Sequence, residues 1–305
     1  MKRILTRENI LMTKQNNSES LRSMFFVPGF RKKFLDKSIS FDADALILDV
    51  EDSVPDAYKD DARENIKMYL DNNKFNKKVF IRLNSLDSGY LNTDLKYFIH
   101  KNIYGFVPTM IKDEVDIVFY DKLLDQLENE NELEQGYFKL CPLIETGSAV
   151  MKSYDIARTS KRIIGLAFGA EDFLTDMDGL HKTHGISILT ARSMIVMAAR
   201  SLGLEAIDTP YLKITDLDGF KKELNFCREL GFSGKLLIHP SQIDPSNSIF
   251  SPSQNEIDEA RKIIAAIDES SRRGEGVTLI DGALVGPPME KRARNVIKKY
   301  EKINK

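Results

Sequence analysis

The chain has 305 residues, of which 42% are hydrophobic and 30% are charged, so it contains enough apolar material for a large globular core. Its 44 Lys and Arg side chains against 46 Asp and Glu leave a net charge of −2, which argues against general nucleic-acid binding. No apolar run approaches the length of a membrane span, which argues against a membrane protein.

The first 20 residues mix basic side chains with Glu8 and Glu19 and lack the continuous apolar region of a secretory signal. We therefore expect a flexible N-terminal extension at residues 1–20, and the two acids disfavour a transit peptide. Cys141 and Cys227 fall in a predicted strand and a predicted helix, so we interpret them as buried thiols in a reducing compartment. A cytoplasmic protein is expected.

Short apolar runs and helical segments then alternate eight times. The predicted strands cover residues 24–27, 45–50, 79–83, 105–107, 140–144, 163–168, 206–209 and 235–238. The predicted helices cover residues 31–39, 59–70, a segment ending near 100, 113–127, a helix-sized spacer after residue 145, 188–202, 216–230 and 253–267. Eight such units are what a (β/α)8 TIM barrel requires, so we predict this α/β fold over residues 21–270. Residues 271–305 are expected to form a C-terminal extension that caps the barrel or reaches a neighbouring subunit.

Acidic side chains follow the fifth and sixth predicted strands. Glu145 follows the fifth, and the Glu171-Asp172 pair follows the sixth. A helix-sized spacer makes these strands parallel neighbours, so Glu145 and Asp172 are expected side by side at the carboxyl end of the sheet. Two carboxylates there are suitable oxygen ligands for a hard cation such as Mg²⁺. Spacing alone equally allows two helix N-caps, because acids also favour helix starts.

Polar residues also end other predicted strands, at the face where barrel enzymes carry their active sites. Glu51 and Asp52 follow the second strand, Arg82 lies in the third, and His239 follows the eighth. A lone histidine in a Pro-flanked turn is interpreted as a structural hydrogen bonder.

Seven collinear segments resemble the citrate lyase beta-subunit family, within the HpcH/HpaI aldolase superfamily that includes malyl-CoA and citramalyl-CoA lyases. The resemblance covers about residues 22–293 and is carried by RSMFFVPG, ALILDVEDSVP, VFIRLNSLDSG, CPLIETGSAV, LAFGAEDF, ARSMIVMAARSLGLEAIDTP and GKLLIHPSQI. It implies a barrel enzyme that uses Mg²⁺ to cleave or form a 3-hydroxy-acyl thioester such as citryl-, citramalyl- or malyl-CoA. It also implies a homo-oligomer, trimer or hexamer, or a subunit of a citrate lyase complex.

The resemblance assigns roles to individual residues. The family's metal carboxylates correspond to Glu145 and Asp172, and its substrate arginine to Arg82. Arg82 would face the thioester oxygen, where negative charge develops during C–C cleavage. Glu145, through the metal, and the backbone N–H groups around Ala170 would hold the keto-acid product. Asp52 is expected to orient a metal-bound water or Arg82, with a helix N-cap as the alternative.

Three further residues correspond to the family's coenzyme A contacts: an aromatic residue, Phe26, and two lysines, Lys33 and Lys37. The alternatives are core packing for Phe26 and a solvated helix face for the lysines. The thioester could be carried by CoA or by an acyl carrier protein.

The chain departs from the family in its tail. Many members carry an aspartate there, in a pattern like DGxMxDxP, as an acid–base group for the next subunit's site. Here the tail reads IDGALVGPP, which puts Gly286 at that position and Asp281 as the nearest acid. Thr109 also stands where lysine is usual, and Phe30 where asparagine is common. Two alternatives therefore stay open: a metal aldolase acting on a free 2-keto acid, and a non-catalytic partner subunit.

Overall fold

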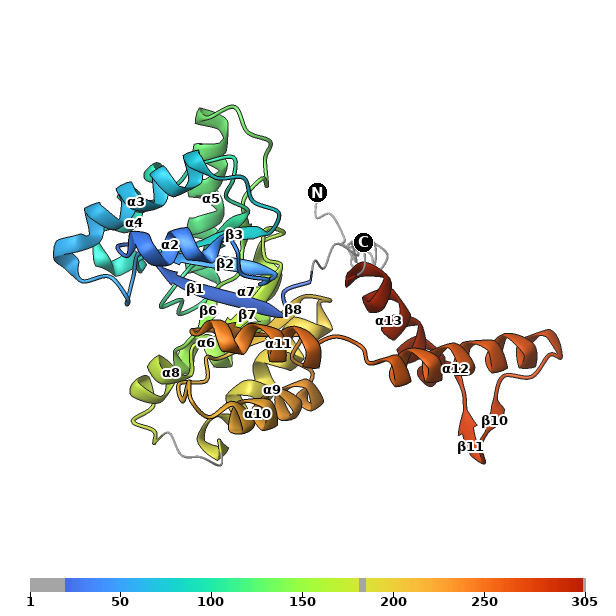
Figure 1. Cartoon of the computed structure of the whole chain (residues 1–305). Coiled ribbons are helices and arrows are strands. Elements are labelled where there is room, and N and C mark those ends of the chain that lie inside the picture. Colours follow the sequence, from blue (N-terminus) through green and yellow to red (C-terminus); the bar gives the residue numbers. More distant parts are fainter. Residues whose placement is uncertain (1–19, 181–184, 304–305) are drawn as a thin grey trace, which may run out of the picture. The chain divides into compact units, whose positions relative to one another are not determined.

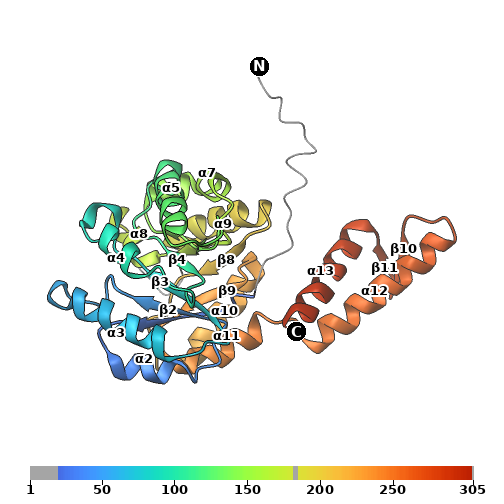
Figure 2. The ribbon, with the colours of Figure 1, turned by 90° about the horizontal axis from the view of Figure 1, so that it is seen from above.

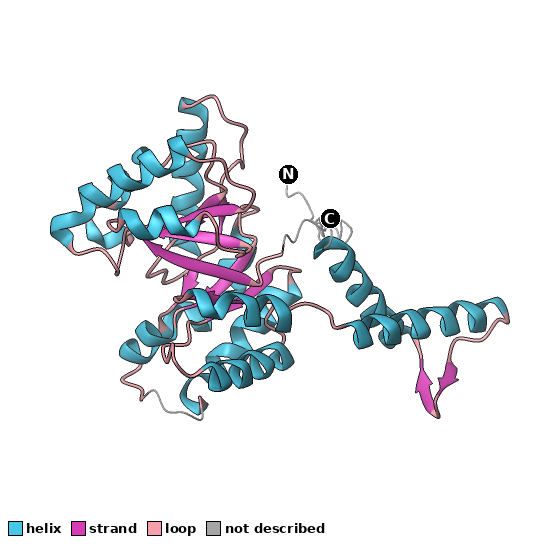
Figure 3. Ribbon diagram, viewed as in Figure 1, coloured by secondary structure: helices cyan, strands magenta, loops and turns pink. Residues whose placement is uncertain are grey.

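A computed structural model describes residues 20–180 and 185–303, which contain a parallel sheet of nine strands (Figures 1 and 3). The expected extension of residues 1–20 lies, except for Ser20, outside the described residues. The strand order is β5-β4-β3-β2-β1-β9-β8-β7-β6. Their bounds are β1 (Ser23–Pro28), β2 (Ala45–Asp49), β3 (Lys78–Arg82), β4 (Gly105–Val107), β5 (Lys139–Leu140), β6 (Leu143–Ile144), β7 (Gly165–Phe168), β8 (Glu205–Asp208) and β9 (Gly234–Leu237).

Every predicted strand is present within a few residues, and the fifth is divided in two. Pro142 has no N–H to donate, so regular pairing stops between β5 and β6. β5 pairs with β4, whereas β6 pairs with β7. Both ends of the strand order therefore belong to the single segment 139–144.

The sheet curls around a core made by alternate residues of its strands. Strands buried on both faces are expected to be continuously apolar, as these are. The side chains on the inner face form one cluster, namely Leu21, Met24, Ala45, Ile47, Phe80, Val107, Cys141, Leu143, Ala167, Ile207 and Leu236. The other face is covered by helices, which surround the sheet when it is viewed from above (Figure 2).

Most of the covering helices follow their strands as the sequence pattern predicts. The covering helices are α2 (Lys32–Ser38), η1 (Asp56–Tyr58), α3 (Lys59–Asn72), η2 (Leu86–Ser88), α4 (Leu91–Tyr97), α5 (Glu114–Glu130), α6 (Gly147–Met151), α7 (Ser153–Thr159), α8 (Ala170–Asp176), α9 (Ile186–Ser201) and α10 (Leu217–Leu230). The short helices η1, η2 and α8 are additional to those predicted. Within the described part of the chain, no helix combines the length and the apolar character needed to cross a membrane.

The helix after the last strand differs from the prediction. The segment expected as a loop forms η3 (Pro240–Gln242) and α11 (Ile243–Ile249). His239 and Gln242 form a capping box and Pro240 lies in the first turn, where proline is tolerated. Proline and polar residues therefore mark a helix start here and not a loop, and His239 is the structural hydrogen bonder that was expected.

The chain divides into two compact units between Asn247 and Ser248. The second unit contains α12 (Gln254–Arg272), β10 (Thr278–Ile280), β11 (Ala283–Val285) and α13 (Pro287–Ile303), and α12 packs on α13. The helix expected at 253–267 is α12. β10 and β11 form an antiparallel hairpin whose turn residues, Asp281 and Gly282, both have positive φ, as an Asp-Gly hairpin turn requires.

Candidate active site at the carboxyl ends of the strands

Glu145 and Asp172 lie together, as their spacing predicts. β6 ends one residue before Glu145 and pairs with β7, which leads through Gly169 into α8. Neither acid is an N-cap: the side chain of Thr146 caps α6, and Gly169 stands at the N-cap of α8. The N-cap alternative is therefore wrong for both residues.

Glu145 is almost completely buried, with 3% of its surface exposed. Its Oε1 accepts a hydrogen bond of 2.6 Å from the N–H of Met110, whose φ of 52° is rare for a residue with a side chain. Burial, and then the charge of Asp172, raise the pKa of Glu145 to about 7. A Cβ atom at Gly169 would lie 2.5 Å from Glu145 Oε2, so the glycine leaves room for this carboxylate.

The surroundings of Asp172 also disfavour its charge. The residue lies at the exposed start of α8, and partial desolvation followed by the negative charge of Asp52 raises its pKa. Asp52 acts in the same direction on Glu145. The negative charges of Asp172 and Asp52 thus both disfavour the ionised form of Glu145, and a cation bound by Glu145 and Asp172 would relieve this repulsion.

Arg82 ends β3 and faces Asp49, its register partner at the end of β2. The pair is bidentate: Nε lies 2.8 Å from Oδ1 and Nη2 lies 2.6 Å from Oδ2. The remaining nitrogen, Nη1, lies 2.9 Å from Asp52 and 3.1 Å from Glu51. Asp52 therefore makes the contact to Arg82 that was expected, although Asp49 accepts two hydrogen bonds from Arg82 and Asp52 only one.

Glu51, which also contacts Arg82, has a raised pKa, whereas the pKa of Asp49 is lowered. Burial raises the pKa of its carboxyl to about 8, Arg82 opposes the shift, and the charges of Asp52 and Asp49 add to it. Asp52 is more open, with 60% of its side chain exposed.

Phe26 lies beneath this cluster and the two lysines lie outside it. The ring of Phe26 packs against the core cluster and carries the guanidinium of Arg82 at 4.7 Å from its centroid. Lys33 and Lys37 are exposed on α2. The N–H of Ala170, expected to face a substrate carboxylate, donates to Thr209 Oγ1 at 3.1 Å.

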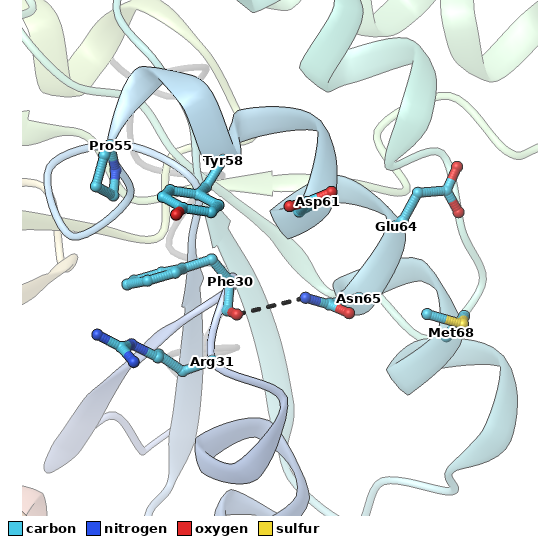
Figure 4. A pocket seen from close by; sticks show the side chains of 8 residues that line it. All are labelled: Phe30, Arg31, Pro55, Tyr58, Asp61, Glu64, Asn65 and Met68. Carbon is cyan, nitrogen blue, oxygen red and sulfur yellow. Dashed lines mark hydrogen bonds between the residues drawn. The ribbon is translucent and has the colours of Figure 1, made fainter.

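A pocket of about 680 Å³ lies beside α2, between the loop that follows β1 and the start of α3 (Figure 4). The rings of Phe30 and Tyr58 lie side by side at its aromatic end, tilted by 32° with centroids 5.9 Å apart, and the guanidinium of Arg31 lies 4.5 Å from the Phe30 centroid. The lining residues are Phe30, Arg31, Pro55, Tyr58, Asp61, Glu64, Asn65 and Met68.

Sequence reasoning missed three residues of this site. Asp49 was available as a signal, because it begins the acidic run DVED, but the predicted strand extended past it to Val50. Met110 donates a backbone N–H to Glu145, and Gly169 leaves space for the Glu145 carboxylate because it has no side chain. Neither contribution has a sequence signature of its own.

The chain resembles proteins of known family over most of its length. The profile of the HpcH/HpaI aldolase/citrate lyase family matches residues 22–240. Citrate lyase subunit beta of Leuconostoc mesenteroides subsp. cremoris is 33% identical over 284 residues, which cover 93% of this chain and 94% of that protein. A (3S)-malyl-CoA thioesterase of Cereibacter sphaeroides is 28% identical over 289 residues, covering 94% and 97%.

Solved structures agree in fold. The CitE protein of Mycobacterium tuberculosis, in complex with magnesium, acetoacetate and coenzyme A, has a TM-score of 0.76 and 24% identity, covering 93% of this chain and 99% of that one. The chain therefore belongs to the HpcH/HpaI aldolase/citrate lyase family, and with it to the carbon–carbon lyases.

Proposed function

We propose that the protein is a Mg²⁺-dependent lyase that cleaves a 3-hydroxy-acyl thioester, such as a citryl, citramalyl or malyl thioester, into a keto acid and an acyl thioester. The observation that carries this proposal is the meeting of Glu145, Asp172 and Arg82 at one end of the sheet. The relatives named as a citrate lyase subunit and a malyl-CoA thioesterase support the substrate class.

The donor set fits Mg²⁺. Within residues 20–180 and 185–303, no three His, Cys, Asp or Glu side chains are grouped as metal ligands. Two carboxylates suit Mg²⁺, which keeps several waters and accepts substrate oxygens, better than Zn²⁺, which takes three or four protein ligands. Glu145 and Asp172 would hold the ion. When bound, it would polarise the oxygens of the keto acid.

The chain's own residues would perform the remaining steps. The Asp52 carboxylate would accept the hydroxyl proton of the substrate as the C2–C3 bond breaks. The electrons of that bond would pass to the thioester as an enolate, whose oxygen Arg82 would stabilise, and solvent would then protonate its carbon. Arg82 is already held by its acidic partners, so it need not reorganise when the charge develops. The backbone around Ala170 would hold the keto-acid carboxylate after the Thr209 hydroxyl moves aside.

Coenzyme A is the carrier that this surface fits best. Arg31, Lys33 and Lys37 place three cations on and beside α2, where phosphates could bind. The neighbouring rings of Phe30 and Tyr58 would offer an aromatic face to an adenine ring. In this arrangement Phe26 would serve the site indirectly, by supporting Arg82 from below.

We further propose that the sheet is a closed (β/α)8 barrel, because both ends of its strand order belong to segment 139–144. A cytoplasmic homo-oligomer, trimer or hexamer, is proposed with it, either alone or within a citrate lyase complex. Leu279 and Leu284 support assembly: they face each other across the β10–β11 hairpin and are 69% and 65% exposed.

A thermal-shift screen with Mg²⁺ tests the function against its alternatives. Acetyl-CoA, free CoA, oxaloacetate, glyoxylate and pyruvate are added in turn. We expect stabilisation that depends on both Mg²⁺ and CoA or its thioester. Stabilisation by keto acids alone would favour the free 2-keto acid aldolase, and no response would favour a non-catalytic subunit.

Substitution of the metal carboxylates tests the site directly. Glu145→Ala and Asp172→Ala should each abolish Mg²⁺-dependent cleavage while the protein remains folded. Asp155→Ala, at an exposed acid of α7, is the matched control and should retain activity. Full activity in either metal-site variant would refute the assignment.

A further inference from the structure

Asp49 is a buried carboxylate at the centre of the site's hydrogen bonds, with 1% of its surface exposed. It accepts hydrogen bonds from Nε and Nη2 of Arg82, at 2.8 and 2.6 Å. It also accepts the N–H of Glu51 at 2.9 Å, the N–H of Ser53 at 3.1 Å, and the hydroxyl of Ser53. One side chain thus holds the arginine and the turn that carries Asp52.

These contacts fill the carboxylate. Two oxygens offer about four lone-pair sites, and described residues already occupy them. Burial opposes the charge of Asp49, but the Arg82 guanidinium and the hydrogen bonds outweigh it and lower its pKa. Asp49 therefore stays ionised and has no acceptor left for a substrate, so a direct chemical role is excluded.

A second aspartate, just before the same strand, makes a comparable ion pair at its opposite end. Asp44 immediately precedes β2 and pairs with Arg22, with Nε at 2.9 Å and Nη2 at 2.6 Å. That pair lies at the amino end of the sheet, away from Glu145 and Asp172. The Asp44–Arg22 and Asp49–Arg82 pairs are both bidentate, but only the Asp49–Arg82 pair lies at the carboxyl end of the sheet, beside the site.

We propose that Asp49 is a positioning residue, which locks the guanidinium of Arg82 and the turn bearing Asp52 into one preorganised unit. This inference rests on the proposed function, because it assigns Arg82 the task of facing the developing negative charge. Without Asp49, Arg82 would keep acidic neighbours at Nη1 but lose the two-point contact that sets its direction.

The test compares Asp49→Asn with Asp44→Asn in the full-length protein. Asp49→Asn should lower kcat about 10–100-fold, the usual cost of a misaimed catalytic group, with little change in KM. The thermal shift caused by Mg²⁺ alone should persist, because Asp49 does not contact Glu145 or Asp172. Asp44→Asn should lower Tm and leave kcat unchanged.

A double-mutant cycle separates positioning from general stabilisation. Arg82→Lys removes the bidentate fork. Adding Asp49→Asn to Arg82→Lys should therefore lower kcat by a smaller factor than Asp49→Asn does alone, because only the effect on the turn bearing Asp52 remains. Independent, multiplying losses would overturn the inference. Asp49→Glu, which keeps the charge but displaces it by one methylene, should also lower kcat, and it serves if Asp49→Asn fails to fold.

The mobility of the Arg82 side chain tests the inference without relying on turnover. The ¹⁵Nε–H order parameter of Arg82 should be that of a rigid group in the unmutated protein and fall below about 0.6 in Asp49→Asn. A rigid Arg82 in that variant would overturn the inference whatever the activity. Absence of lyase activity in the unmutated protein would instead contradict the proposed function.

Discussion

At the scale of single residues, the site depends on how Glu145 is held. Its carboxylate is buried, accepts the backbone N–H of Met110, and occupies space that only a glycine at position 169 leaves open. The φ of Met110 stores strain, typically about 1–3 kcal/mol, which the surrounding fold must offset. Together these features hold the Glu145 carboxylate in a buried position, where desolvation disfavours its charged form.

Gly169→Ala should weaken Mg²⁺ binding about tenfold or more. The new Cβ would lie 2.5 Å from Glu145 Oε2 and 2.7 Å from Glu145 Cβ, so the carboxylate must move. Isothermal titration calorimetry with Mg²⁺ measures the change. Gly276→Ala is the matched control, because a Cβ there meets no described atom within 4 Å. Equal affinities in the two variants would show that the space beside Glu145 is unimportant.

Mg²⁺ affinity should fall as the pH falls through about 7. Burial and Asp172 raise the pKa of Glu145 to about 7, and the metal needs the ionised form, so protons compete with it. Below that pKa the dissociation constant should rise about tenfold per pH unit. Without metal the sign for stability is opposite: the folded state binds this proton more tightly, so stability decreases as the pH rises from 4.5 toward 7.

A Mg²⁺ titration between pH 5.5 and 8 checks this prediction. Glu145→Gln, which cannot titrate, should lose the dependence near pH 7. An affinity that is flat across this range in the unmutated protein would contradict it.

At the scale of elements, the proposed function assigns carrier binding to α2 and the loop before it, apart from the residues of the chemical step. Arg31 and the exposed lysines lie on the outer surface, while Arg82 sits at the end of β3 above the core. A contact to a phosphate remote from the breaking bond affects the substrate and the transition state equally. Changes on α2 should therefore alter KM and not kcat.

Lys33→Glu should raise KM for a CoA thioester about tenfold, the value of one charge-assisted hydrogen bond, with little change in kcat. Steady-state cleavage kinetics measure it. The same variant should behave normally with an N-acetylcysteamine thioester, which carries no phosphates. Lys122→Glu on α5 is the control for the change in charge. An unchanged KM would favour the alternative, in which Lys33 is only a solvated residue on the surface of α2.

At the scale of the whole molecule, we expect the second unit to influence which reactions accompany cleavage. Its tail carries Gly286 at the position to which the family resemblance assigns an aspartate. Asp281 lies at the hairpin turn and is paired with Lys262 at 2.5 Å. Glycine can transfer no proton, so we expect poor hydrolysis of the acyl thioester together with measurable cleavage.

Gly286→Asp should add thioester hydrolysis to the lyase activity. Gly286 does not have a positive φ, so aspartate can adopt its backbone conformation, and the new Cβ would lie 3.2 Å from Val277 Cγ1, which requires only a small shift. Release of free CoA from acetyl-CoA measures the gain. Strong hydrolysis by the unmutated protein would contradict the prediction and direct attention to Asp281.

The sequence by itself determined the parallel strands, most of their helices, and the placing of Glu145, Asp172 and Arg82 at one edge. These features follow from local patterns: buried strands are apolar throughout, and parallel strands end at the same edge. The sequence also indicated the family.

Only the tertiary structure decided which acid of the DVED run holds Arg82, because that depends on register: Asp49 and Arg82 are direct partners across β2 and β3. It also decided that the Met110 N–H faces Glu145 and that Gly169 leaves space for it. Such contacts join residues far apart in the chain, and a hydrophobic pattern reports burial without reporting partners. The same holds for α11, where proline and a capping histidine begin a helix whose Ser246 and Asn247 hydrogen-bond to Arg22 and Ser23, at the start of β1.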